Sequence, residues 1–234
     1  MSRDDFYDQL PRFAPRRQLP HLRSATSPPE YDSLLARGCD HVISIHPPGK
    51  LTTIVNSARQ AAQDFPNKIT VLDSGSLSLG LGFRALAAAE AAEDGLDAAL
   101  DAVKSTRERL KVYAALETME YLRRSGRVPG AIATLGGLLS IKPLIELAEG
   151  EVKAIGAVRT TKQANERMLN LLLQDGELER LAILHTGAEA RAKDFLNTLM
   201  QTVSQSVPRD ILLVNVTTVI GTHARVRTGW GSRR

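Results

Sequence analysis

Short apolar runs alternate with longer stretches of helical periodicity along most of this 234-residue chain, and that alternation strongly limits the folds open to it. Runs rich in Val, Ile and Leu between turn residues predict strands at 41–46, 68–73, 111–117, 138–147, 153–159, 180–186 and 210–221. Apolar residues at helical spacing predict helices at 29–38, 53–65, 81–95, 96–110, 161–176 and 188–205. The pattern predicts an α/β protein.

The strand–helix units change character near residue 110. Before it, units of about 30 residues predict a parallel sheet with right-handed crossovers. After it, two predicted strands flank the sequence AEGE, whose Gly150 indicates a hairpin turn, so that sheet should be at least partly antiparallel. We therefore expect two domains, at 1–110 and 111–234.

The composition narrows the kind of ligand that such a protein can enclose. Of the residues, 43% are hydrophobic and 24% are charged, which is ordinary for a globular chain, but only 4% are aromatic. A buried pocket must therefore be walled mainly by Leu, Ile, Val and Ala. Such a pocket suits an aliphatic ligand better than a stacked base.

Nothing in the sequence indicates secretion or a membrane span. The single cysteine, Cys39, cannot form an internal disulfide, and the charged N-terminal segment lacks the apolar run of a signal peptide. Lys142, Glu146 and Arg84 interrupt the longest apolar stretches before they reach the roughly 18 residues of a membrane helix. We expect a cytoplasmic protein without stable membrane insertion.

The segment SIHPPGKLTTIVNSA, at 44–58, contains the clearest candidate for an anion site. It begins as a strand and ends as a helix, with a Pro-Pro-Gly break and two threonines in between. The first turn of a helix has free N–H groups and a partial positive charge, so a turn lined by hydroxyls can hold an anion. The alternative is that Thr52 or Thr53 only caps the helix.

Three other features could take part in binding. Residues 71–82 place Asp73 among serines and glycines after a strand, but this segment also fits a capped helix start and lacks the spacing of a P-loop. Residues 121–131 hold three arginines around a Ser-Gly turn, which could meet an oxyanion or lie in a solvated loop. His223 follows an apolar run and could either face a ligand or have a purely structural role. No residue spacing indicates a metal site, and no nucleophile motif indicates a hydrolase.

Seven segments carry a resemblance when they are taken in order: LRSATSPPEY, HPPGKLTTIVNSA, VLDSGSLSLGLG, LETMEYLRRSGRV, LGGLLSIKPLIELAEGEV, AVRTTKQA and VIGTH. In order and spacing they resemble the DegV family of bacterial fatty-acid-binding proteins. The resemblance implies a Rossmann-like parallel-sheet domain followed by a mixed or antiparallel α/β domain. It also implies a carrier that encloses a long-chain fatty acid, needs no cofactor, and presents the acid to a separate fatty acid kinase.

The start of the chain departs from the family pattern. Members normally open with an additional strand that ends in an Asp-Ser pair, whereas this chain begins at the following helix, so we expect a truncated or shortened first domain. In the family's Thr-Ser-x-Pro-Ser-Pro segment, Ser24 keeps the serine and Arg23 replaces the threonine. A gap would instead align residues 26–27. The resemblance assigns Ser24 and Arg23 to the fatty-acid carboxylate.

Three more headgroup residues follow from the resemblance. The family's Ser-Lys-Leu-Ser-Gly-Thr segment reads GKLTTI here, so Thr52 takes the hydroxyl role and Thr53 replaces a glycine. His223 keeps the histidine of a His-x-Gly-Pro-Gly segment whose two glycines are missing. We expect all three side chains to lie near the carboxylate.

The resemblance also implies a docking surface for the kinase, for which Arg123, Arg124, Arg127 and Arg159 are candidates. The planar guanidinium group binds oxyanions in bidentate fashion, which suits contact with an acidic surface or with nucleotide phosphates. The alternative is that some of these arginines form internal salt bridges.

Two other classes of function stay open. In an enzyme, Asp73 or His223 would act on an acyl substrate. In a nucleic-acid-binding protein, the net charge of +4, which is concentrated at 12–23 and 223–234, would contact phosphates through basic arms. The scarcity of aromatic residues and the lack of a recognition motif count against nucleic acid.

Overall fold

The computed structural model describes residues 29–127, 141–203, 207–223, 226–228 and 230–232. Within these ranges the chain forms two compact units. The first unit comprises 29–108 together with 149–151, and the second comprises the remaining described residues from 109 onward. No helix in the described ranges combines the length and the apolar character that a membrane crossing requires.

The first unit is a short parallel sheet between two layers of helices. β1 and β2 run parallel, with Val42 opposite Ile69 and His46 opposite Asp73. Because side chains alternate across a strand, Val42 faces α2 and α3 while its neighbour Ile43 faces α4 and α5. The elements of this part of the chain are α2 (Pro29–Ala36), β1 (Val42–His46), α3 (Ile54–Ala62), β2 (Ile69–Asp73), α4 (Leu79–Glu90), the 3-10 turn η2 (Ala92–Asp94) and α5 (Leu96–Arg109).

The second unit is built on mixed pairing. Its strands lie in the orders β3-β10-β7-β8 and β6-β5-β4-β9. β7 and β8 are parallel, whereas β4 is antiparallel to both β5 and β9, and β10 is antiparallel to β3 and β7. Its elements are β3 (Leu110–Lys111), β4 (Tyr113–Leu116), α6 (Glu120–Ser125), β5 (Lys142–Ala148), β6 (Glu151–Val158), α8 (Thr161–Asp175), β7 (Arg180–His185), α9 (Glu189–Val203), β8 (Ile211–Asn215), α10 (Thr218–His223), β9 (Val226–Thr228) and β10 (Trp230–Ser232).

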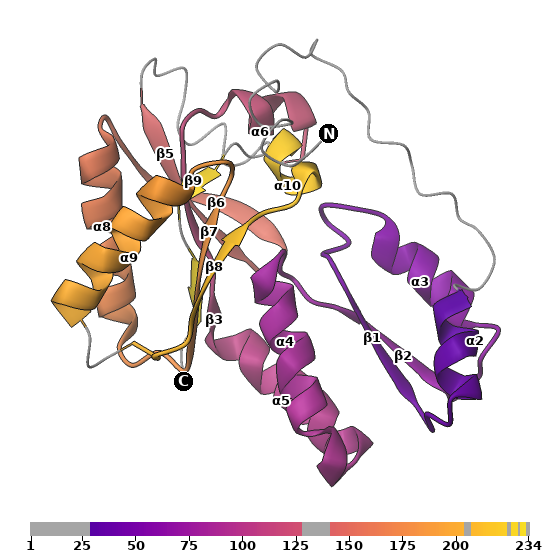
Figure 1. Ribbon diagram of the computed structural model, residues 1–234. Coiled ribbons are helices and arrows are strands. Elements are labelled where there is room, and N and C mark those ends of the chain that lie inside the picture. Colours follow the sequence, from indigo (N-terminus) through magenta and orange to yellow (C-terminus); the bar gives the residue numbers. More distant parts are fainter. Residues whose placement is uncertain (1–28, 128–140, 204–206, 224–225, 229, 233–234) are drawn as a thin grey trace. The chain divides into compact units, whose positions relative to one another are not determined.

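The main core of the second unit lies under α8 and α9, which run side by side along its strands (Figure 1). Met168 and Leu172 of α8 and Phe195 and Leu199 of α9 are buried against Ile183 and its neighbours on the strands. A smaller cluster, which includes Leu116 and Leu122, lies under α6 on other residues of β4 and β5. The mixed α/β fold expected from the sequence is confirmed.

The prediction of a strand that runs to residue 221 is wrong. The strand predicted at 210–221 ends at Asn215, where its ladder with β7 also ends, and the following β-branched residues form α10 instead. Without a neighbouring strand, the backbone of this segment forms helical hydrogen bonds instead, such as that from Gly221 N to Thr217 O. The basic segment at 223–234 is not a free arm where it is described, because it supplies β9 and β10. These strands pair with β4, β3 and β7.

Candidate functional site

The loop between β1 and α3 holds the two threonines singled out in the sequence. The N–H groups of Leu51 and Thr52 both donate to Pro48 O, at 2.9 and 3.1 Å, which forms a tight turn before the helix. Thr53 occupies the N-cap position, but its exposed side chain makes no capping hydrogen bond. Thr52 Oγ1 accepts only a long hydrogen bond, 3.4 Å, from Ile54 N. Neither hydroxyl is a strong helix cap, so both remain available to a ligand.

Asp73, at the end of β2, ties this loop to the next one. Its Oδ2 accepts from Gly49 N at 2.8 Å and its Oδ1 accepts from Gly75 N at 2.7 Å. Each carboxylate oxygen is therefore engaged by backbone. Asp73 therefore has a structural role, because it holds residues 47–52 against residues 73–76.

The turn at 149–151 packs against these two loops. We call the three segments, residues 47–52, 73–78 and 149–151, the junction. Glu149 and Gly150 have φ values of 51° and 75°, as a two-residue hairpin turn requires. The predicted hairpin turn at Gly150 is thus confirmed. Gly150 N donates to Gly75 O at 2.9 Å, and a Cβ on Gly150 would come within 2.9 Å of Pro48 Cβ.

Ion pairs surround the junction. Lys50 Nζ lies 2.7 Å from Glu151 Oε1, and Arg107 on α5 pairs with Glu149. The hydrogen bond from Arg107 is the main reason that the pKa of Glu149 lies below its usual value. Both pairs are largely exposed, so solvent weakens their contribution to stability.

The start of α4 forms the remaining side of the junction. Ser74 Oγ donates to Ser76 O and accepts from Ser76 N, which closes a buried turn. Ser78 then occupies the N-cap position with φ 52° and ψ −132°, outside the usual regions for a residue with a side chain, and it makes no side-chain capping bond. The sequence allowed a helix start capped by a side chain here, but the Ser78 side chain does not cap α4. Backbone strain of this kind is often found at ligand sites.

Arg84 is a buried charge in an otherwise Ala- and Leu-rich helix. Only 3% of its surface is exposed, and its Nε and Nη1 atoms have no hydrogen-bond partner. Burial first, and repulsion from Arg107 second, lower the pKa of Arg84 to about 10, against the opposing effects of Glu149 and Asp73. The guanidinium is still charged at neutral pH. In the sequence, Arg84 stands out only as an interruption of an apolar stretch.

The second unit has a polar cluster of its own where β4 ends and β5 begins. Lys142, of the Ile-Lys-Pro sequence, pairs with Glu117, and Arg191 Nη1 lies 3.4 Å from the other oxygen of the same carboxylate. In the same unit, His185 Nδ1 accepts from Ala188 N just before α9. These groups satisfy one another, and we assign them to the stability of the second unit.

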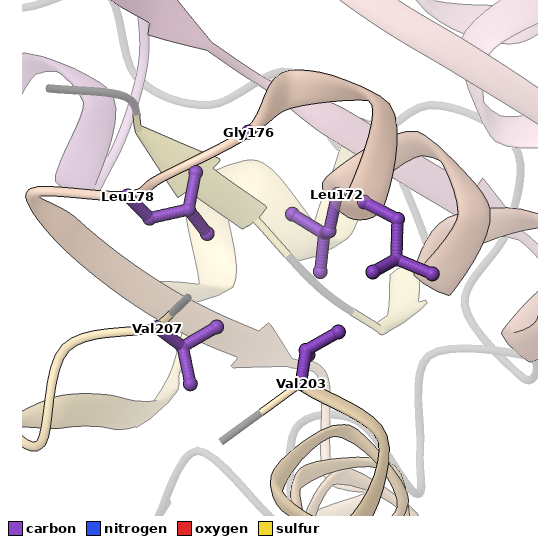
Figure 2. Close-up of a pocket in the computed structure, with 6 residues that line it drawn as sticks. Leu172, Gly176, Leu178, Val203 and Val207 are labelled. Atoms are coloured by element: carbon purple, nitrogen blue, oxygen red, sulfur yellow. The ribbon is translucent and has the colours of Figure 1, made fainter. Parts of the chain in front are cut away.

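A small apolar pocket also lies in the second unit (Figure 2), where leucine and valine side chains from the end of α8 and from around α9 converge. Its volume is about 40 Å³. That volume is far below the about 300–1,000 Å³ of usual ligand sites. The pocket cannot contain a long acyl chain. Its lining residues are Leu172, Leu173, Gly176, Leu178, Val203 and Val207.

The predicted headgroup residues are distributed unevenly over the described chain. Arg23 and Ser24 lie outside the described residues. Thr52 and Thr53 belong to the first unit, and His223 is the last residue of α10 in the second. No group of three or more His, Cys, Asp or Glu residues that could hold a metal ion occurs in the described ranges.

The four candidate docking arginines occupy different local settings. Arg123 forms an exposed ion pair with Glu120 on α6, at 2.8 Å. This agrees with the alternative interpretation, in which some of these arginines form internal salt bridges. Arg124 lies on the same helix. Arg127 Nη1 donates to Ser125 O just beyond it, and Arg159 is an exposed residue before α8.

The comparison with known proteins agrees with these features. A model of the family described as "Uncharacterised protein, DegV family" matches residues 2–228. A DegV domain-containing protein of Deinococcus radiodurans is 40% identical over 182 residues, which cover 72% of this chain and 64% of the relative. This chain therefore spans less than two thirds of the length of that relative.

Solved structures resemble the chain as well. One, described as showing fatty acid binding of a DegV family protein from Thermus thermophilus, has a TM-score of 0.76 and 36% identity, and the match covers 87% of this chain and 75% of that one. DegV of Bacillus subtilis, described as a fatty acid binding protein, has a TM-score of 0.75 and 27% identity over 88% of this chain and 76% of its own. With the family model matching nearly its whole length, the chain belongs to the DegV family.

Proposed function

We propose that this protein is a cytoplasmic carrier that binds a long-chain fatty acid and holds its carboxylate at the hydroxyl-bearing helix starts of the first unit. The observation that carries this proposal is the likeness to the Thermus thermophilus protein described as binding fatty acid, at 36% identity over 87% of this chain. The uncommitted hydroxyl of Thr53 and the weakly bonded one of Thr52 support it from within the molecule.

Energetics allow tight binding of such a ligand. Burying a chain of about 16 carbons at about 0.8 kcal/mol per methylene offers on the order of 10 kcal/mol, against association costs of several kcal/mol. The low aromatic content, 4%, favours an aliphatic lining for the chain. The carboxylate then contributes mainly orientation, because it exchanges water for hydroxyl partners.

The direct test is mass spectrometry of lipids extracted from the purified protein. We expect fatty acid in a stoichiometric amount and uptake of labelled palmitate or oleate by delipidated protein. Because the chain spans only part of the length of its relatives, the same assay on the chain extended by the N-terminal strand region of a relative is the control. Failure of both forms to retain or take up fatty acid would contradict the proposal.

Thr52 is the residue on which the headgroup part of the proposal can be tested. Thr52→Val removes the hydroxyl at nearly constant shape, so we expect palmitate affinity to fall several-fold with little change in stability, since the capping bond of Thr52 is long. Calorimetric titration and thermal unfolding separate the two effects. Equal losses in affinity and stability, or unchanged affinity, would return Thr52 to a purely structural role.

We further propose that the bound acid is presented to a fatty acid kinase and that the surface around α6 takes part in docking. Arg124→Ala should leave lipid content unchanged and reduce acyl-phosphate formation by that kinase. Arg167→Ala, an exposed arginine on α8, is the matched control. Loss of bound lipid together with a lower melting temperature would assign Arg124 to the fold instead.

A further inference from the structure

Two buried polar groups of the first unit lack partners, and both belong to the corner where the β2–α4 loop meets α4. Among the described residues of this unit, the buried side-chain nitrogen and oxygen atoms without a hydrogen bond are Ser76 Oγ and Arg84 Nε and Nη1. Ser76 is 2% exposed and Arg84 is 3% exposed. Buried polar atoms are almost always satisfied in folded proteins, so each of these exceptions calls for a partner.

The geometry of α4 directs Arg84 toward this corner. Side chains on a helix incline toward its N-terminus, and residues four apart lie on the same face. Four residues before Arg84 on that face stands Gly80, which is buried and has no side chain to cover the guanidinium stem. Ser76 precedes the N-cap residue Ser78 by two positions, so the first turn of α4, in which Gly80 N already donates to Leu77 O, borders the corner with its partial positive charge.

The other charges nearby are already engaged. Glu149 pairs with Arg107, and Asp73 accepts hydrogen bonds from two backbone N–H groups. Both acids interact with Arg84 electrostatically, but no hydrogen bond reaches its Nε or Nη1. A buried charge without a direct partner is costly, and a donor-rich corner with a positive helix end favours an anion over a neutral group.

We propose that Arg84 and Ser76 bind an oxyanion at the start of α4. The inference rests on the proposed function where the oxyanion is the carboxylate of the bound fatty acid; a free inorganic oxyanion is the other source of the same chemistry. Arg84 then selects acids over alcohols of equal chain length. An alcohol has the same tail but offers no charge to the guanidinium.

Arg84→Met tests this selectivity, because methionine keeps much of the apolar stem and removes the charge. Palmitate and 1-hexadecanol are titrated into delipidated wild-type protein and into the variant. We expect palmitate affinity to fall about tenfold to a hundredfold, as for loss of a charged hydrogen bond, with hexadecanol affinity unchanged. Arg107→Met is the control, because it removes a neighbouring exposed guanidinium that already has a partner, and it should preserve the preference for palmitate.

A second arm uses inorganic sulfate and does not depend on fatty-acid binding. If wild-type protein takes up no palmitate, the proposed carrier function fails, but a sulfate-dependent rise in melting temperature that Arg84→Met abolishes still supports the oxyanion site. Should Arg84→Met not fold, Ser76→Ala decides, with a loss of a few-fold in palmitate or sulfate affinity expected. Unchanged palmitate preference and unchanged sulfate response in the folded variant would overturn the proposal and leave Arg84 solvated by water.

Discussion

The two units treat the hydroxyl residues at their helix starts differently. In the second unit, Thr160 begins α8 with a capping box: its side chain accepts from Gln163 N at 3.1 Å, and Gln163 Oε1 accepts from Thr160 N at 3.2 Å. In the first unit, Thr53 before α3 and Ser78 before α4 make no side-chain capping bond. The second unit uses its hydroxyl for folding, whereas the first leaves hydroxyls available for another partner.

The hydrophobic cores of the two units also differ, in size and in continuity. The apolar residues under α8 and α9 form one cluster around Phe195, whereas the sheet of the first unit separates two small clusters, one on each face. The junction adds a carboxylate that holds two loops and a turn packed closely on Pro48. We infer that stability is concentrated in the second unit and that the first carries the backbone strain, since the non-glycine residues with positive φ among the described residues, Asn67, Ser78 and Glu149, all belong to it.

The largest expected effect comes from emptying the larger core. Phe195→Ala should cost about 3–5 kcal/mol of unfolding free energy, because the ring is almost wholly buried and leaves a cavity. Val55→Ala, at a fully buried position of the first unit, should cost about 2 kcal/mol. Urea unfolding measures both. An equal or larger cost for Val55→Ala would break the contrast between the two cores.

The next effect concerns the turn at the junction. Gly150→Ala should destabilise the protein by more than about 1 kcal/mol, because its φ is 75° and the new Cβ would lie 2.9 Å from Pro48 Cβ. Gly38→Ala introduces comparable backbone strain at φ 92° with nothing within 4 Å, so the difference between the variants isolates the close approach. Similar melting temperatures for the two would show that the contact with Pro48 adjusts freely.

The comparison of helix starts can be sharpened with one pair of variants. Thr160→Ala should lower the unfolding free energy by about 1 kcal/mol, the usual cost of a lost N-cap. Thr53→Ala should change it by only a few tenths, since that side chain makes no capping bond. Chemical denaturation with matched m-values separates these costs. A loss at Thr53 as large as that at Thr160 would mean that the first helix start is capped after all.

The smallest effect is a pH dependence in the first unit. Tyr31 donates to Ser44 Oγ, which lies 2.7 Å from His46 Nε2. Burial first, and Arg59 second, lower the pKa of His46. The unfolded chain therefore takes up a proton near pH 6.5 before the folded one does, and stability present above that pH is lost as the pH falls through the folded pKa.

His46→Gln removes this titration and is the test of it. We expect the difference in unfolding free energy between wild type and variant to shrink as the pH falls from 7.5 to 5, by a modest amount because the histidine is only half-buried. Comparing the two proteins cancels the titration of all other groups. A difference that stays constant over this range would contradict the role of His46.

Local patterns in the sequence predicted most helices and strands closely. β1 and β2 lie within the predicted runs 41–46 and 68–73, and α8 occupies 161–175 of the predicted 161–176. These elements are predictable because apolar periodicity and turn residues are local features, which residues close together in the sequence determine. The family itself was recognisable for the same reason, because its motifs are short and contiguous.

Tertiary structure decided what those patterns left open. The run of β-branched residues after Asn215 becomes α10 because the neighbouring strand ends at His185, and the basic C-terminal segment becomes strands because β4, β3 and β7 offer partners. The sequence pointed to Thr52 and Thr53 through their place before a helix. It could not show that Nε and Nη1 of Arg84 are buried without a hydrogen-bond partner, because burial and hydrogen bonding depend on chain segments that are distant in sequence and meet only in the folded protein.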